Sequence, residues 1–257
     1  LVALLKQGGG AAEQAAGALM NLASNSAENQ RAIVKAEAMP RLIEMLKDAE
    51  GNSRRAREYV AGALMNLTLK HPQMQVEVAK AGAIPLLVSM LKDNGQMEEV
   101  AGALTNLADS NEANQLAVVN AGAVEPLVKL LSSCCSSAQE EAAGTLMNLS
   151  ACAANKEKVV KAGAVEPLIK LLSTGSSGCR EHAAGALANL ANGVDAHQQL
   201  IGEAGAATPL LELLALPKPA ESVFGMPAGI ACVTGGSASG GAPARAASAL
   251  SLLSKHK

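Results

Sequence analysis

Five asparagines recur along the chain at nearly constant spacing. Asn21, Asn66, Asn106, Asn148 and Asn189 stand 45, 40, 42 and 41 residues apart. A carboxamide side chain offers a hydrogen-bond donor and an acceptor, which together match the main chain of any peptide. A glutamate stands eight residues before each asparagine, at Glu13, Glu58, Glu98, Glu140 and Glu181. A row of carboxylates steers partners that carry Lys or Arg, so these residues predict recognition of a protein or peptide.

The residues seven positions before each asparagine belong to the same candidate surface. They are Gln14, Tyr59, Glu99, Glu141 and His182. Each interpretation has a structural alternative that the sequence leaves open. An asparagine of the row could instead bind the end of its own helix or the neighbouring repeat. The glutamates could simply favour the positive end of a helix dipole and solvate the surface.

Catalytic and cofactor sites are not indicated by any motif. The chain contains no G-x-x-x-x-G-K-[ST] loop, no H-E-x-x-H and no G-x-S-x-G elbow. The cysteine count of five is odd, no C-x-x-C pair occurs, and the four histidines show no ligand spacing with them. We therefore expect reduced thiols, no metal, no cofactor and no enzymatic activity.

Charge and hydropathy argue against two further classes of partner. The formal net charge is -2, which gives no bulk attraction to nucleic acid or to an anionic membrane. The longest uncharged apolar run, at 223–233, is too short and too rich in Gly and Pro to span a membrane. We expect neither nucleic-acid binding nor a transmembrane segment.

The asparagines end a recurring phrase that predicts the architecture. Ala-Ala-Gly-Ala-Leu-Met-Asn-Leu at 15–22 returns at 60–67, 100–107, 142–149 and 183–190, with a worn copy at 246–253. Self-similarity at about 40 residues indicates a stacked repeat array. Ala and Leu favour helices over strands, and only one Phe, one Tyr and no Trp are present.

Each repeat contains three expected helices. A short helix ends at an Ala-Gly-Ala corner, a second helix opens with Pro, and the asparagine phrase forms the third. The first corner has Glu37 in place of Gly, which predicts either a strained corner or a different turn there. The units are a partial one at 1–26 and full ones at 27–71, 72–111, 112–153, 154–194 and 195–257. A Pro- and Gly-rich insertion near 217–241 is expected to be a surface loop.

A helical wheel of the third helix separates two sides. The Leu residues after and two before the asparagine, with the Ala residues five and six before it, form one apolar arc, and the asparagine faces away. Gly always stands four residues before the asparagine: Gly17, Gly62, Gly102, Gly144 and Gly185. These glycines indicate either close approach of adjacent helices or a wide, smooth groove.

The order of helix, Gly corner, Pro-started helix and Ala-Leu-x-Asn-Leu helix resembles the armadillo repeat, clearest at 81–88 and 183–190. The resemblance covers nearly the whole chain. It implies an all-α, right-handed superhelical solenoid with about five full units and an N-terminal partial unit. By resemblance, third helices line a concave groove where the asparagines bind partner peptides. Importin-alpha typically has Trp where this chain has Gly, so binding of nuclear localisation signals is not carried over.

The sequence thus predicts a non-catalytic scaffold that binds partner proteins or peptides through Asn21, Asn66, Asn106, Asn148, Asn189, Glu58, Glu98, Glu140, Glu181, Tyr59, Glu99 and Glu141. One alternative is the substrate-recognition part of a larger ubiquitin ligase, as in plant proteins with a U-box ahead of armadillo repeats. A nuclear transport adaptor is disfavoured. We expect a cytoplasmic protein, with membrane association or nuclear residence as alternatives. A U-box or a lipid anchor ahead of Leu1 stays open.

Overall fold

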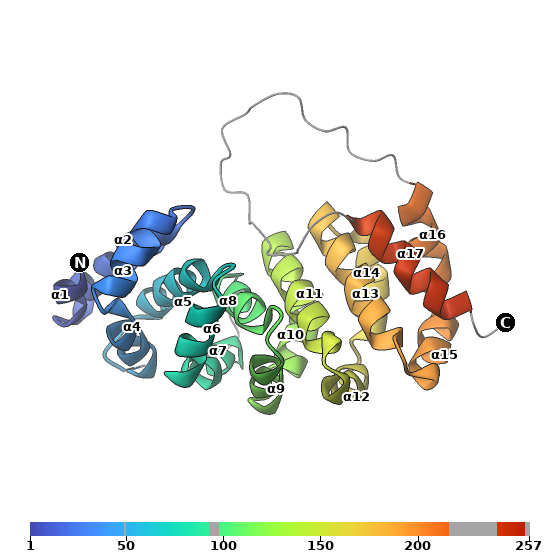
Figure 1. Cartoon of the computed structure of the whole chain (residues 1–257), viewed down its shortest axis with the longest axis horizontal. Coiled ribbons are helices and arrows are strands. Elements are labelled where there is room, and N and C mark those ends of the chain that lie inside the picture. Colours follow the sequence, from blue (N-terminus) through green and yellow to red (C-terminus); the bar gives the residue numbers. More distant parts are fainter. Residues whose placement is uncertain (49, 93–97, 216–240, 255–257) are drawn as a thin grey trace, which may run out of the picture.

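The chain folds as a row of helices. The computed structural model describes residues 1–48, 50–92, 98–215 and 241–254, and every regular element in these ranges is helical. Three helices make one unit, and the units stack one after another from the N-terminus to the C-terminus (Figure 1). Most of the predicted insertion, residues 216–240, lies outside the described residues.

The third helices form the spine of the stack. They are α2 (Gly9–Ala23), α5 (Arg54–Thr68), α8 (Glu98–Ala108), α11 (Ser136–Ala151), α14 (Ser177–Ala191) and α17 (Ala242–Leu253). Each packs mainly against the third helix before it and the third helix after it. In Figure 1, α11, α14 and α17 stand side by side in the upper half of the molecule.

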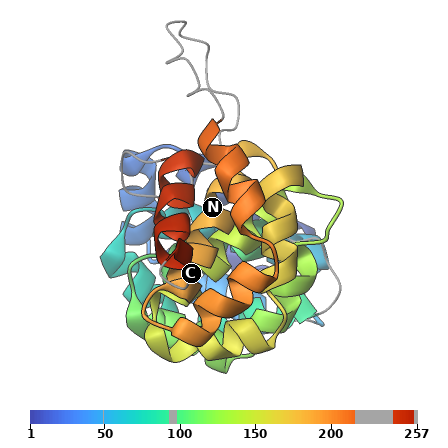
Figure 2. The same cartoon turned by 90° about the vertical axis from the view of Figure 1, so that its right-hand side faces the viewer.

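The first and second helices complete each unit. The first helices are α3 (Ala27–Lys35), α6 (Pro72–Lys80), α9 (Glu112–Asn120), α12 (Ala153–Lys161) and α15 (Asp195–Glu203). The second helices are α1 (Val2–Leu5), α4 (Ala38–Lys47), α7 (Ala83–Lys92), α10 (Val124–Leu130), α13 (Val165–Thr174) and α16 (Ala207–Ala215). The prolines predicted to open the second helices lie at their third residue, still inside the first turn, where the missing N–H had no helical partner. Viewed from the C-terminal end, the units overlap, with the last helices, drawn in orange and red, in front of the others (Figure 2).

The corner between first and second helices needs a left-handed residue. Glycine occupies it in four units, with φ of 86° at Gly82, 83° at Gly122, 77° at Gly163 and 83° at Gly205. Glycine adopts this conformation without steric cost. Glu37 takes the same place in the second unit with φ of 56°, so of the two alternatives predicted for this corner the structure supports a strained corner and not a different turn.

The apolar arc predicted on the third helices is their buried side. In α8, Ala101, Leu104 and Leu107 are all fully buried. The core is built almost wholly from Leu, Ala, Val, Ile and Met. Within this arc, Leu22 stays 44% exposed in the first unit, where only the short helix α1 precedes it, and Ala247 is exposed in the last third helix, α17.

Polar pairs near the start of the first helices cap the third helices, a role that the sequence analysis did not assign. In α9, Asn114 donates to the carbonyl of Leu107 at 2.8 Å, and Gln115 donates to that of Ala108 at 2.9 Å. Carbonyls in the last turn of a helix lack helical partners, so these side chains fix the angle between consecutive helices. The pattern recurs at Asn29–Gln30 and at His197–Gln198.

Candidate partner-binding face

The six third helices present one continuous surface, which we call the third-helix face. It contains all twelve residues predicted to bind a partner, since each lies on α2, α5, α8, α11 or α14. The row of asparagines therefore crosses the stack from unit to unit. The structure thus brings the predicted residues together on one side of the molecule.

The asparagine row is bonded between units. Asn66 donates through Nδ2 to the carbonyl of Met20 at 2.9 Å, and Asn106 donates to that of Met65 at 2.8 Å. In both cases the acceptor immediately precedes the asparagine of the previous unit. Asn148 and Asn189 continue the row, donating to Thr105 at 3.0 Å and to Met147 at 2.9 Å. The structural alternative, binding to the neighbouring repeat, is therefore realised.

The same asparagines keep free hydrogen-bonding capacity. One N–H of each amide is used between units, which leaves the second N–H and the Oδ1 atom. Within the described part of the chain, no hydrogen bond reaches these Oδ1 atoms. Asn21 is exposed and Asn106 is 8% exposed, with Asn66, Asn148 and Asn189 half-buried. Structural bonding and contact with a ligand are thus geometrically compatible.

The glycines of the recurring phrase are not exposed along an open groove. All five are buried, because side chains of the units on either side cover them. A Cβ added at Gly185 would lie 2.6 Å from Met147 Sδ, and one added at Gly17 would lie 3.1 Å from Tyr59 Cδ2. A Cβ at either place would displace the Met147 side chain or press on the Tyr59 ring, so the packing between neighbouring helices depends on glycine here. Of the two interpretations of these glycines, close approach of adjacent helices is the one that the structure supports.

The glutamates eight residues before the asparagines bond locally. Glu58 pairs with Arg54 at 3.0 Å within α5, and Glu181 accepts from Arg245 of α17 at 3.2 Å. Glu140 accepts from the hydroxyl of Ser176, 2.7 Å away at the start of α14. The bonds of Glu140 and Glu181 tie consecutive units together, whereas the bond of Glu58 lies within one helix, and all three carboxylates stay partly accessible. Glu98 is half-buried at the start of α8.

The residues seven before the asparagines lie over the glycines of the previous unit. Tyr59 covers Gly17 and accepts from Arg55 at 2.8 Å. Glu99 lies over Gly62, and its burial raises the pKa of its carboxyl group above the ordinary value. Glu141 is 4% exposed and lies against Gly102. These residues therefore determine the shape of the third-helix face as well as its charge.

His182 also lies over a glycine of the previous unit, but its burial lowers a pKa where that of Glu99 raises one. It covers Gly144, and burial lowers the pKa of its imidazole. Its Nδ1 atom lies 3.2 Å from the carbonyl of Glu140. The ring is therefore a neutral packing group near pH 7 rather than an added positive charge.

Charge is unevenly distributed along the face. The central helices α8 and α11 carry Glu98, Glu99, Glu140 and Glu141 and no Lys, Arg or His. Arginines stand on α5, α14 and α17 at either side. Arg245, which the sequence analysis did not single out, occupies the covering position over Gly185 in the last unit. The face thus has an acidic middle between ends that carry cations.

Among the described residues there is neither a metal-binding cluster nor an activated buried thiol. No group of three His, Cys, Asp or Glu side chains there could hold a metal ion. Cys152 and Cys179 are buried thiols, and burial raises the pKa of Cys179, which makes it a poor nucleophile. No single described helix is long and apolar enough to cross a membrane, although α6 and α7 together pass by length and composition despite a bend of 78°. What the surface does offer is a row of amides and carboxylates for recognition.

A stack of three-helix units that presents one polar row is the architecture of an α-helical repeat scaffold. The chain belongs to the armadillo-repeat family: residues 3–211 match the plant U-box protein ARM repeat region. No curated protein matches the chain. The predicted all-α armadillo solenoid is confirmed.

Solved structures agree with this assignment. A designed armadillo repeat protein is 26% identical, with 98% of each chain covered and a TM-score of 0.81. A set of computationally designed armadillo repeat proteins for modular peptide recognition is similar at 25% identity, with 98% of this chain and 97% of that chain covered and a TM-score of 0.78. A third, a designed armadillo repeat protein in complex with peptide (KR)4, is 26% identical, with 98% and 99% covered and a TM-score of 0.76.

Proposed function

We propose that the protein is a non-catalytic scaffold that binds an extended segment of a partner protein on the third-helix face. The asparagine row would bond the partner's main chain through the Oδ1 atoms left free by the inter-unit bonds. Glu98, Glu99, Glu140 and Glu141 would attract Lys or Arg at the centre of that segment. The observation that carries the proposal is this acidic middle beside a continuous row of amides.

The similar designed protein in complex with (KR)4 supports a basic peptide as the first probe. We expect labelled (KR)4 to bind in a fluorescence anisotropy titration, and we expect binding to weaken as salt is added. The double variant Glu98→Gln, Glu140→Gln removes two charges and keeps two hydrogen-bond acceptors. It should weaken binding roughly five- to tenfold, because each partly accessible charge contributes modestly.

The matched control changes net charge equally but elsewhere. Glu166 on α13 and Glu212 on α16 are exposed residues of second helices. The double variant Glu166→Gln, Glu212→Gln should bind (KR)4 as the unchanged protein does. Equal weakening in both double variants would refute the face as the binding site, because net charge alone would then explain the attraction.

A second function is favoured by the family match over residues 3–211, which is to the armadillo region of plant U-box proteins. In that case the face would select substrates for a ubiquitin ligase. Sequencing the transcript upstream of the Leu1 codon tests this idea directly. A U-box reading frame there supports it, and an in-frame stop codon immediately before a start codon refutes it.

We also propose the cytoplasm as the compartment of the protein. Cys135, Cys152 and Cys179 are free thiols, as expected in a reducing environment. Fractionation of cells that express the full gene product tests this proposal. Recovery in a washed membrane pellet or in nuclei would overturn it.

A further inference from the structure

A pocket lies away from the third-helix face, at the corner between the second and third units. First and second helices α3 and α4 form one side of it, and α6 of the next unit forms the other. Its volume is about 630 Å³, within the range of sites that bind side chains and small ligands. We call it the α3–α4–α6 pocket.

The floor of the α3–α4–α6 pocket is apolar and adaptable. Val34 is 37% exposed, whereas Ile43 and Met74 lie deep, at 3% exposure each. Met39 lies beside them and is half-buried. Methionine side chains refit easily around different ligands. The floor can therefore take an aliphatic or aromatic side chain.

The rim of the pocket is mainly acidic. Glu37 and Glu77 are exposed, and their carboxylates make no hydrogen bond or ion pair with any described residue. Glu44 is already paired with Arg41, and Lys47 is the single basic residue of the lining. Two carboxylates are thus available to a cation placed beside the apolar floor.

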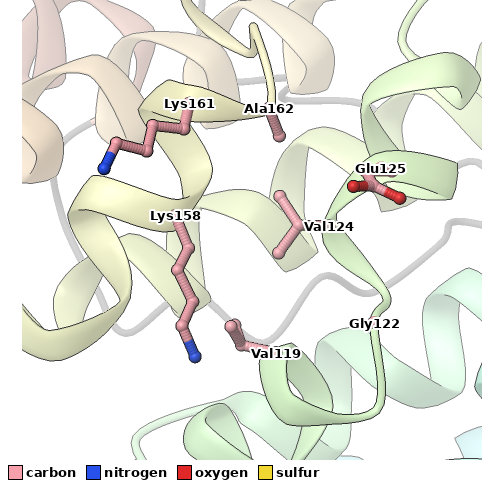
Figure 3. Close-up of a pocket in the computed structure, with 7 residues that line it drawn as sticks. All are labelled: Val119, Gly122, Val124, Glu125, Lys158, Lys161 and Ala162. Atoms are coloured by element: carbon pink, nitrogen blue, oxygen red, sulfur yellow. The ribbon is translucent and has the colours of Figure 1, made fainter.

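The repeat builds an equivalent pocket two units later, with the opposite charge. It lies between α9, α10 and α12 and has a volume of about 300 Å³ (Figure 3). Counted from the corner residue, Val119 and Val124 stand where Val34 and Met39 stand in the first pocket. Lys158 takes the place of Glu77, and Gly122 takes the place of Glu37. The acidic rim of the α3–α4–α6 pocket therefore comes from its own residues and does not follow from the fold alone.

Glu37 keeps a side chain where the other corners have glycine. Its φ of 56° is unfavourable for a residue with a Cβ. Its carboxylate has no hydrogen-bond or ion-pair partner among the described residues, so no polar contact of that group offsets the strain. The strain alone does not indicate a binding site. It does allow an experiment to change stability and binding in opposite directions.

We propose that the α3–α4–α6 pocket is a second docking site, which takes a partner segment with an apolar side chain directly followed by Lys or Arg. The apolar side chain lies on Val34, Met39, Ile43 and Met74, and the cation lies between Glu37 and Glu77. The acidic rim attracts a segment that carries Lys or Arg and repels a segment that carries Asp or Glu. Since the site uses first and second helices, it is open while the third-helix face is occupied.

The test uses the full chain with methyl-¹³C methionine and the capped peptide Leu-Lys-Arg as probe. Met39 and Met74 report on the pocket, and Met65 and Met147 report on the third-helix face. We expect the Met39 and Met74 methyl resonances to shift with millimolar peptide and to stay unchanged with capped Leu-Glu-Glu. Shifts confined to Met65 and Met147, or no shifts at all, overturn the proposal.

Two variants separate docking from folding. Glu37→Gly removes the carboxylate and relieves the corner, so it should raise the melting temperature and still weaken binding roughly fivefold. Glu37→Gln keeps the strained corner and should weaken binding by the same factor. The control Glu125→Gln, at the equivalent pocket of Figure 3, should leave the titration unchanged. If Glu37→Gly binds the peptide as tightly as the unchanged chain, the pocket is not the site.

Discussion

At the scale of single residues, the asparagines are the point where structure and recognition meet. A helical wheel correctly places them opposite the buried arc, and on that basis alone they would all be solvent-facing ligands. The structure adds a carbonyl from the previous unit within 2.8 Å of Asn106, so this amide has a structural partner. Asn21 is exposed, and no described residue accepts from its side chain. The row therefore contains both kinds of asparagine.

This difference predicts unequal costs of substitution. Asn106→Ala should lower the free energy of unfolding by roughly 1–2 kcal/mol, because the partly buried carbonyl of Met65 loses its shorter side-chain hydrogen bond and keeps only that from Thr68. Asn21→Ala should change stability by less than about 0.5 kcal/mol, as ordinary surface substitutions do. Urea unfolding followed by circular dichroism measures both. Equal losses in the two variants would show that the inter-unit bond does not stabilise the stack.

The wheel fails at the glycines for a physical reason. It describes one helix, whereas Gly62 is covered by Met20 of the previous unit and Glu99 of the next. Such coverage depends on the spacing and rotation of neighbouring helices, which no periodicity within one helix contains. Repetition at about 40 residues, by contrast, is a property of the chain itself, and it was enough to predict the three-helix unit and the stack.

At the scale of elements, the corners decide how each unit turns. The corner between first and second helices was predictable, because Gly recurs there and its absence at Glu37 is visible in the sequence. The corner between a third helix and the next first helix was not predictable. Asn25, Lys70, Ser110 and Gly193 all adopt positive φ at equivalent places. Four different residue types carry no common signal for this conformation, and Cys152, at the equivalent place of the remaining unit, has a φ of -77° instead.

Lys70 is therefore strained in a position where the chain elsewhere uses glycine. Its φ is 53°, against 74° at Gly193. Lys70→Gly should raise stability by about 1 kcal/mol, because the left-handed conformation costs about that much for a residue with a Cβ. Gly193→Lys should lower stability by a similar amount and serves as the reverse control. Thermal unfolding of both variants measures the effect, and a loss of stability in Lys70→Gly would contradict the strain argument.

At the scale of the whole molecule, each unit of the solenoid packs mainly against the units next to it. Each third helix contacts the third helices on either side, and the acidic middle of the face lies on α8 and α11, which have third helices on both sides. In such an array, stability is approximately a sum of unit and interface contributions. A recognition surface in the middle is therefore held more firmly than one at an end.

This organisation predicts that damage to the core spreads only to adjacent units. Leu104 in α8 is fully buried, so Leu104→Ala should cost about 2–5 kcal/mol locally through lost burial and the cavity left behind. Amide hydrogen exchange should rise in α5, α8 and α11 and stay nearly unchanged in α17, which does not pack on α8. Binding of (KR)4 should weaken in this variant, because Glu98 and Glu140 stand on the loosened helices. A uniform rise in exchange from α2 to α17 would mean that the units unfold as one cooperative body. The acidic residues would then gain no local stability from their central position.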